Sequence, residues 1–162
     1  MLFDFTDPLA ADAWRAIDDR VMGGISQSRL RFDPQGHAVF EGDVSLQHNG
    51  GFASVRSRPG ARGQAGATAC LIVVSGAGKQ YKISFLTDDG VDSLNYQASF
   101  TPTTDGWQTL RLPLAGFRPT WRGRDVLAAP PLDPTHIRQV GLLIAARQAG
   151  PFSLAIRFIA LS

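Results

Sequence analysis

The sequence contains very little lysine or glutamate. Only Lys79 and Lys82 among its 16 basic residues are lysines, and only Glu41 among its 14 acidic residues is a glutamate. Exposed helix surfaces use Lys and Glu freely because both are flexible helix formers, so this scarcity disfavours a helical protein. The formal net charge of +2 is too small for a surface that follows nucleic-acid phosphates, and we expect no nucleic-acid partner.

Cysteine is also nearly absent. The single residue, Cys70, excludes an internal disulfide and a cysteine zinc cluster. It lies in the apolar run Ala69–Val74, which favours a small buried hydrophobic residue over a reactive thiol. No histidine is paired at helical spacing with another His or Glu, and the Asp18–Asp19 and Asp88–Asp89 pairs lack the spacing of a calcium loop. We therefore predict no metal and no cofactor.

Long apolar runs, leader segments and catalytic motifs are missing as well. Residues 1–7 carry acids where a signal or transit peptide carries bases, and no stretch approaches the roughly 18 apolar residues of a membrane span. We expect a cytoplasmic protein that meets a membrane only through a partner. The sequence has no P-loop, no dinucleotide-binding fingerprint and no nucleophile elbow, so no enzymatic activity or catalytic residue is predicted.

What the sequence does contain is period-two alternation, interrupted by turns that draw on 17 glycines and 10 prolines. The predicted strands are 28–32, 38–46, 52–57, 67–74, 79–87, 94–100, 109–114, 136–145 and 152–161. Many short strands at regular spacing over 162 residues predict a single all-β domain, residues 1–162, built as an antiparallel β-sandwich or barrel.

Three segments receive more specific predictions. Asp7 as an N-cap and Pro8 in the first turn indicate a short helix over Pro8–Asp18. The segment Pro119–Pro134 contains four prolines, which indicates a long irregular loop. Alternation in the last strand predicts an inward set of Phe152, Leu154, Ile156 and Phe158.

Alternation also gathers polar residues on the side of the strands opposite the core. This set comprises Ser54, Arg56, Lys82, Ser84, Asn95, Gln97, Thr109 and Arg111. If their strands are neighbours, they form one polar surface with Trp107 at its edge. Amides, hydroxyls and guanidinium groups suit a sugar or peptide ligand. The other interpretation is a solvated outer face, which every antiparallel sheet has.

A second candidate recognition element places Trp121 beside Arg122 and Arg124. A guanidinium fork next to an indole can bind a ligand through bidentate hydrogen bonds and cation–π contact. The alternative is that these arginines donate to carbonyl groups of their own loop and hold an irregular segment in place.

Three dense stretches carry a family resemblance. They are Asp19–Ser26 (D-R-V-M-G-G-I-S), Phe40–Arg56 (ending in N-G-G-F-A-S-V-R) and Trp121–Arg124 (W-R-G-R). Through the order of these stretches, and through weaker matches from about Trp14 to Ile159, the chain resembles the NADH:ubiquinone oxidoreductase (complex I) intermediate-associated protein 30 family. The chain is most similar to the small bacterial members that consist of little but this domain.

The resemblance implies a galactose-binding-domain-like jelly roll and non-enzymatic work. Mitochondrial members are assembly factors that bind intermediates of respiratory complex I. The implied function is a binding module, an assembly factor or chaperone, with a complex I subunit or intermediate as protein partner. The alternative is a carbohydrate- or small-ligand-binding jelly roll. With Trp121 added, the family's recurrent polar positions give the candidate binding residues Asn49, Ser54, Arg56, Gln97, Trp107, Trp121, Arg122 and Arg124.

Overall fold

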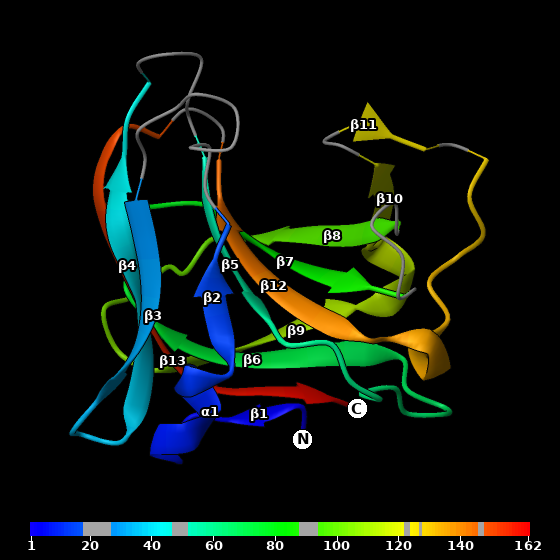
Figure 1. The fold of residues 1–162 in the computed structure, drawn as a ribbon, viewed down its shortest axis with the longest axis horizontal. Helices are drawn as coiled ribbons and strands as arrows, with labels where there is room; N and C mark the ends of the chain where they lie inside the picture. Colours follow the sequence, from blue (N-terminus) through cyan, green and yellow to red (C-terminus); the bar gives the residue numbers. More distant parts are fainter. Residues whose placement is uncertain (18–26, 47–51, 88–93, 122–123, 127, 146–147) are drawn as a thin grey trace.

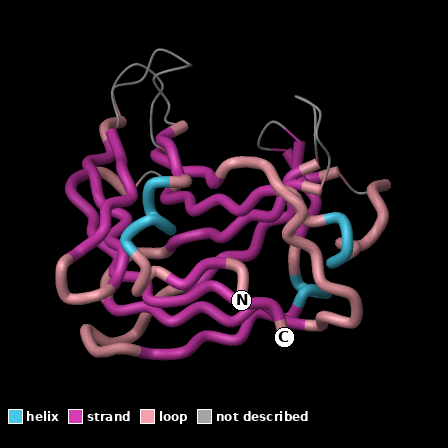
Figure 2. Tube along the Cα trace, turned by 60° about the horizontal axis from the view of Figure 1, so that its bottom comes forward, coloured by secondary structure: helices cyan, strands magenta, loops and turns pink. Residues whose placement is uncertain are grey.

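Two antiparallel sheets face each other in the computed structural model (Figures 1 and 2). The structure describes residues 1–17, 27–46, 52–87, 94–121, 124–126, 128–145 and 148–162. Strands make up most of this trace, and no helix within it is long and apolar enough to cross a membrane. The architecture confirms the predicted all-β antiparallel sandwich.

The first sheet, sheet A, has the order β3–β4–β13–β6–β9, with β1 pairing with the far end of β13. Its strands are β1 (Phe3–Asp4), β3 (Gln27–Asp33), β4 (His37–Val44), β6 (Ala69–Ser75), β9 (Gln108–Pro113) and β13 (Gly150–Leu161). The pairing of Phe3 with Ile159 places the two chain ends close together (Figure 1).

The second sheet, sheet B, has the order β11–β10–β8–β7–β12–β5–β2. Its strands are β2 (Trp14–Ala16), β5 (Ala53–Ser57), β7 (Tyr81–Leu86), β8 (Asn95–Phe100), β10 (Arg118–Trp121), β11 (Arg124–Asp125) and β12 (Gln139–Ile144). The helical segments are short: α1 (Pro8–Asp12) and the 3₁₀ turns η3 (Leu114–Gly116) and η4 (Pro134–His136).

The core fills the space between the sheets with one apolar side chain from every second strand position. Phe40 of sheet A lies 6.2 Å from the ring of Tyr81 in sheet B and 4.9 Å from the ring of Phe152. Such aromatic contacts hold the two layers in register. Cys70 is fully buried here, as predicted, and burial raises the pKa of its thiol to about 12.

The helix prediction was too long. Asp7 caps α1 by accepting a hydrogen bond from the Leu9 amide at 3.0 Å, but the helix ends at Asp12. From Trp14 onward the chain pairs with β5, and the Ile17 amide donates to the Ser54 carbonyl at 2.7 Å. Pairing with a buried strand outweighs the weak helix propensity of this segment, and Trp14 packs against Phe3 at 5.0 Å.

The segment predicted as an irregular loop contains most of β10 and all of β11. These two strands form the last pair at one edge of sheet B. Proline is tolerated near sheet edges because few ladder hydrogen bonds are lost there. Pro119 still contributes its carbonyl, which accepts from the Val126 amide at 2.9 Å.

The inward set predicted for the last strand is wrong at Phe158. A bulge in β13 between Ile156 and Phe158 inserts one extra residue, Arg157, opposite β6. A bulge shifts the alternation by one position, so the inward residues after it are Ile159 and Leu161 instead. Phe158 is only half-buried.

Candidate functional site

The outer face of sheet B carries a continuous row of residues across six neighbouring strands. Cross-strand pairs link them in the order Arg15, Arg56, Gly141, Ser84, Gln97 and Arg118. We call this set the central row. Because directly paired residues of a sheet point to the same side, all of these positions face away from the core.

Gly141 lies at the middle of the central row, where its lack of a side chain lets two neighbouring side chains pack over the backbone. A Cβ atom at this position would lie 2.5 Å from the Ser84 Oγ and 3.4 Å from the Arg56 Cγ. The aliphatic stem of Arg56 therefore lies close to the Gly141 backbone, with Ser84 on the other side. Gly141 and Ser84 are both buried, so any larger residue at position 141 would displace one of its neighbours.

Arg56 is half-buried and has an unusual electrostatic environment. Burial lowers the pKa of its guanidinium group, and the positive charge of the paired Arg15 acts in the same direction. An arginine keeps its proton at neutral pH even so. Two cations therefore stand side by side at this end of the row.

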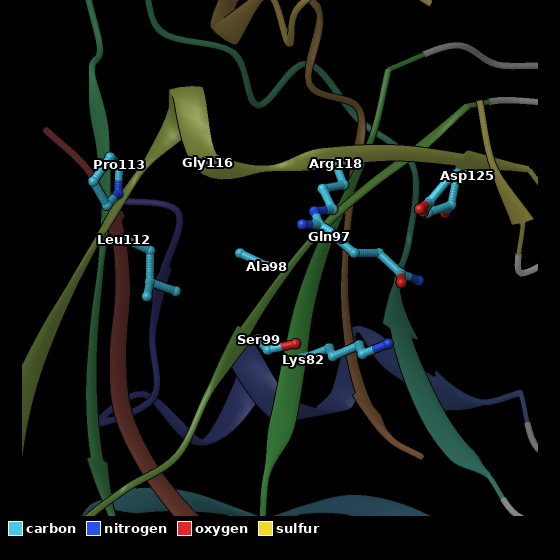
Figure 3. Close-up of a pocket in the computed structure, with 10 residues that line it drawn as sticks. Lys82, Gln97, Ala98, Ser99, Leu112, Pro113, Gly116, Arg118 and Asp125 are labelled. Atoms are coloured by element: carbon cyan, nitrogen blue, oxygen red, sulfur yellow. The ribbon is translucent and has the colours of Figure 1, made fainter. Parts of the chain in front are cut away.

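The other end of the row opens into a cavity of about 450 Å³ (Figure 3). Outer-face residues from four strands line it: Lys82, Gln97, Ser99, Arg118, Thr120 and Asp125. Ala98, Leu112, Pro113 and Gly116 complete the lining. The cavity thus offers an ammonium, a guanidinium, an amide, hydroxyls and one carboxylate to a polar ligand.

The cations of this face have no counterions in the described part of the chain. No carboxylate described by the structure lies within 4.0 Å of the charged nitrogens of Arg15, Arg56, Lys82 or Arg118. The Arg56 guanidinium also donates no hydrogen bond to any residue that the structure describes. Chemically, the face is suited to hold an anionic group and to orient it by hydrogen bonds.

The sequence-predicted candidates are only partly brought together. Arg56 and Gln97 belong to the central row, and Ser54 lies on the same face one row away, opposite Leu143. The Ser54 hydroxyl donates to the Ile17 carbonyl, and the Ser54 carbonyl accepts from the Ser28 hydroxyl at 3.2 Å. Ser54 therefore links β5 to its neighbours.

Trp107 lies on the other sheet. It directly precedes β9, which pairs with β6 in sheet A, so Trp107, Thr109 and Arg111 do not share a surface with Arg56. The single polar surface expected from alternation is therefore divided between the two sheets. The reason is topological: consecutive strands β8 and β9 belong to different sheets, which alternation within each strand does not reveal.

The remaining candidates lie at the edge of sheet B or outside the described residues. Trp121 pairs with Arg124 in the β10–β11 hairpin, and both side chains are exposed. By register they sit on the opposite side of the hairpin from the paired residues Thr120 and Asp125. Asn49 and Arg122 fall outside the residues that the structure describes.

Several residues of this face were missed as candidates: Arg15, Lys82, Arg118, Asp125 and Gly141. Lys82 appeared in the polar set without being selected. Arg15 lies in the segment predicted as helix, and Arg118 directly precedes the segment predicted as loop, so neither was assigned to a strand. A trace of alternation was present at both positions. Arg15 stands between apolar Trp14 and Ala16, and polar Arg118 and Thr120 are two residues apart.

Comparison with a known protein family decides the relationship. The model of the family "Complex I intermediate-associated protein 30" matches residues 3–156. The chain belongs to this family. It is also 31% identical over 169 residues to the uncharacterized protein C9E9.15 of Schizosaccharomyces pombe, a match that covers 90% of this chain and 76% of the yeast protein.

Solved structures with a similar fold include carbohydrate-binding modules. The family 11 module of the cellulosomal cellulase Lic26A-Cel5E from Clostridium thermocellum has a TM-score of 0.70 at 18% identity, covering 99% of this chain and 92% of that one. The family 11 module from Clostridium thermocellum in complex with a β-1,3-1,4-mixed-linked tetrasaccharide has a TM-score of 0.66 at 14% identity. This match covers 92% of this chain and 88% of that one. At these identities the likeness shows the shared β-sandwich fold.

Proposed function

We propose that residues 1–162 form a single non-enzymatic binding module that acts as an assembly factor or chaperone for respiratory complex I. Its partner is a subunit or an assembly intermediate of that complex, held on the outer face of sheet B. The module works in the cytoplasm and meets the membrane-associated complex only through this partner.

One observation carries the proposal: a half-buried arginine, Arg56, stands beside a second arginine with no carboxylate near either group in the described residues. Cations without a counterion contribute little to the stability of a sheet, because like charges at opposite positions of neighbouring strands repel each other. They are useful when a partner supplies the opposite charge. Membership of a family described as complex I intermediate-associated supports the identity of that partner.

Affinity purification from the native organism tests this function. We expect the tagged protein to recover complex I subunits, and a deletion strain to accumulate less assembled complex I. The wild-type gene should restore the assembled amount. Recovery of no respiratory component, with normal complex I in the deletion strain, would refute the proposal. Cell fractionation of the tagged strain tests the proposed location in the same experiment.

The alternative, a carbohydrate- or small-ligand-binding module, is favoured by the cavity at the β8–β10 end of the central row. Gln97, Ser99 and Asp125 offer amide, hydroxyl and carboxylate groups that can pair with sugar hydroxyls. Against it, no described outer-face position on the strands of sheet B is aromatic, and sugars commonly stack on an aromatic ring.

Calorimetric titration with a β-1,3-1,4-mixed-linked tetrasaccharide and a glycan array separate the two functions. The assembly-factor proposal expects no binding at millimolar sugar. Saturable binding that is lost in the Gln97→Ala variant would support the carbohydrate alternative instead.

A further inference from the structure

We propose that the central row recognises an acidic segment of the partner protein, bound in extended conformation with its carboxylates directed at the sheet. This inference rests on the proposed function and adds the chemistry of the partner. The cations that receive the carboxylates are Arg15, Arg56 and Arg118 of the row, together with Lys82, which pairs with Ser99 two residues along the strands from Ser84 and Gln97.

The first argument is electrostatic. Arg15 and Arg56 occupy directly paired positions, where Cβ atoms lie about 4.5–5.5 Å apart and like charges repel. Burial and this neighbouring charge both lower the pKa of Arg56. A carboxylate bound between the two groups replaces the repulsion with two charge-assisted hydrogen bonds, which are the stronger kind. The face is therefore more favourable when occupied by an anion than when empty.

The second argument is geometric. Neighbouring strands lie about 4.8 Å apart, so the five strand intervals from Arg15 to Arg118 cover about 24 Å. Alternate residues of an extended chain lie about 6.6 Å apart on one side. Four acidic residues at alternate positions thus span about 20 Å, close to the roughly 22 Å from a point midway between Arg15 and Arg56 to Arg118.

The third argument separates a protein segment from a nucleic-acid strand. Proteins that bind single strands combine a cationic groove with aromatic side chains on which bases stack. None of the described outer-face positions of sheet B is aromatic. Arginine instead matches the planar carboxylate through bidentate hydrogen bonds, and three of the four cations are arginines.

Fluorescence anisotropy with the full chain provides the test. The probes are a labelled nonapeptide of alternating Glu and Ala, the same peptide with Gln for Glu, and a nine-nucleotide oligothymidine. We expect the Glu peptide to bind at least about tenfold more tightly than the Gln peptide at 50 mM salt, and to weaken steeply at 300 mM salt. The oligothymidine should bind more weakly than the Glu peptide.

Matched variants locate the binding to the row. Arg56→Gln and Arg118→Gln should each weaken binding of the Glu peptide by about tenfold. Arg111→Gln makes the same charge change at an exposed position of sheet A and should change the affinity less than twofold. Gly141→Leu keeps every charge but displaces the Ser84 side chain or the Arg56 stem, and should also weaken binding. Thermal unfolding of each variant verifies that it is folded, and the two arginine variants decide the question if Gly141→Leu does not fold.

The outcomes distinguish this inference from the proposed function. Equal binding of the Glu and Gln peptides, or equal effects of Arg56→Gln and Arg111→Gln, overturns the acidic-segment proposal. Tighter binding of oligothymidine also overturns it and indicates a nucleic-acid surface. If the tagged Arg56→Gln/Arg118→Gln protein still recovers complex I subunits, the assembly function stands and the central row is not its interface. If wild type recovers none, the assembly function fails by itself.

Discussion

The outer faces of the two sheets use similar residues in opposite ways. On sheet A, Glu41 accepts hydrogen bonds from Arg29 at 2.6 and 2.9 Å and from Arg31 at 2.9 Å, and Arg31 also reaches Asp33 at 3.3 Å. On sheet B, the cations of the central row have no such partner in the described part of the chain.

The aromatic groups on the outside follow the same division. The indole of Trp107 on sheet A is covered by the Arg157 guanidinium at 4.1 Å and by the His37 ring at 5.2 Å. The β13 bulge inserts Arg157 into the strand at this point. Around Glu41 and Trp107, sheet A therefore satisfies its exposed groups within the chain, whereas sheet B presents a row of cations outward. The difference teaches that arginine content alone does not mark a binding face; we expect a row of neighbouring cations without internal counterions to mark one.

The largest expected effect comes from the core that both faces share. Phe40 is fully buried and contacts Tyr81 across the sandwich, so Phe40→Ala should cost about 3–5 kcal/mol in the free energy of unfolding. Urea denaturation followed by tryptophan fluorescence and by far-UV circular dichroism measures it. In a single domain the fluorescence and the circular dichroism should change together in one transition. Two separate transitions would show that the sheets unfold independently and would contradict the single-domain proposal.

The second effect tests the paired face. Glu41→Gln removes the charge that two arginines share, and should cost about 1 kcal/mol at pH 7, the upper range for surface ion pairs. Burial by itself would raise the pKa of Glu41, but hydrogen bonds from Arg29 and Arg31 outweigh it and lower the pKa. The stabilisation is therefore present above the pKa of the unfolded chain and is lost as pH falls through the lowered folded pKa.

Urea denaturation of wild type and Glu41→Gln from pH 7 to pH 3 measures this contribution. The difference between them should shrink as the pH falls. Asp43→Asn is the matched control, because Asp43 lies exposed on the same strand without an ion pair to the described residues. A difference that is constant with pH would show that the ion pairs contribute nothing.

The third effect compares the two faces directly with one kind of substitution. Arg31→Gln removes contacts with Glu41 and Asp33 and should lower the melting temperature by about 2–4 °C. Arg56→Gln removes no ion pair, keeps most of the side-chain stem and relieves repulsion by Arg15, so its melting temperature should change by less than about 2 °C in either direction. A large loss in Arg56→Gln would make Arg56 a structural residue and the two faces equivalent.

Alternation within strands predicted the sandwich because it reports the physical requirement that each sheet bury one face. It predicted the outward direction of Arg56, Lys82 and Gln97 for the same reason. It could not assign strands to sheets, since pairing depends on contacts between distant segments. The separation of Trp107 and Arg111 from Arg56 is therefore visible only in the structure.

The short strands at the edges of sheet B were not predicted from the sequence, for a second reason. β2 is three residues long and β11 only two, so each gives at most a short fragment of a periodic signal. Arg15 and Arg118 went unrecognised because they lie on or beside such elements. The role of Gly141 could not be predicted from the sequence either, because it depends on the side chains that two neighbouring strands place beside this residue.

The smallest expected effect is an absence of reaction at Cys70, between the two faces. Its side chain is fully buried on β6, and burial raises the thiol pKa to about 12. At pH 8 only about one molecule in 10⁴ carries the reactive thiolate, and no reagent can reach it without opening the sandwich. Labelling with 5,5′-dithiobis(2-nitrobenzoate) should therefore be negligible in the native protein and complete in urea. Phe40→Ala should label faster and Arg56→Gln at the wild-type rate, because only the former weakens the contact between the sheets. Stoichiometric labelling of native wild type would mean that the layers separate readily, and the paired and unpaired faces could then not be treated as opposite sides of one rigid body.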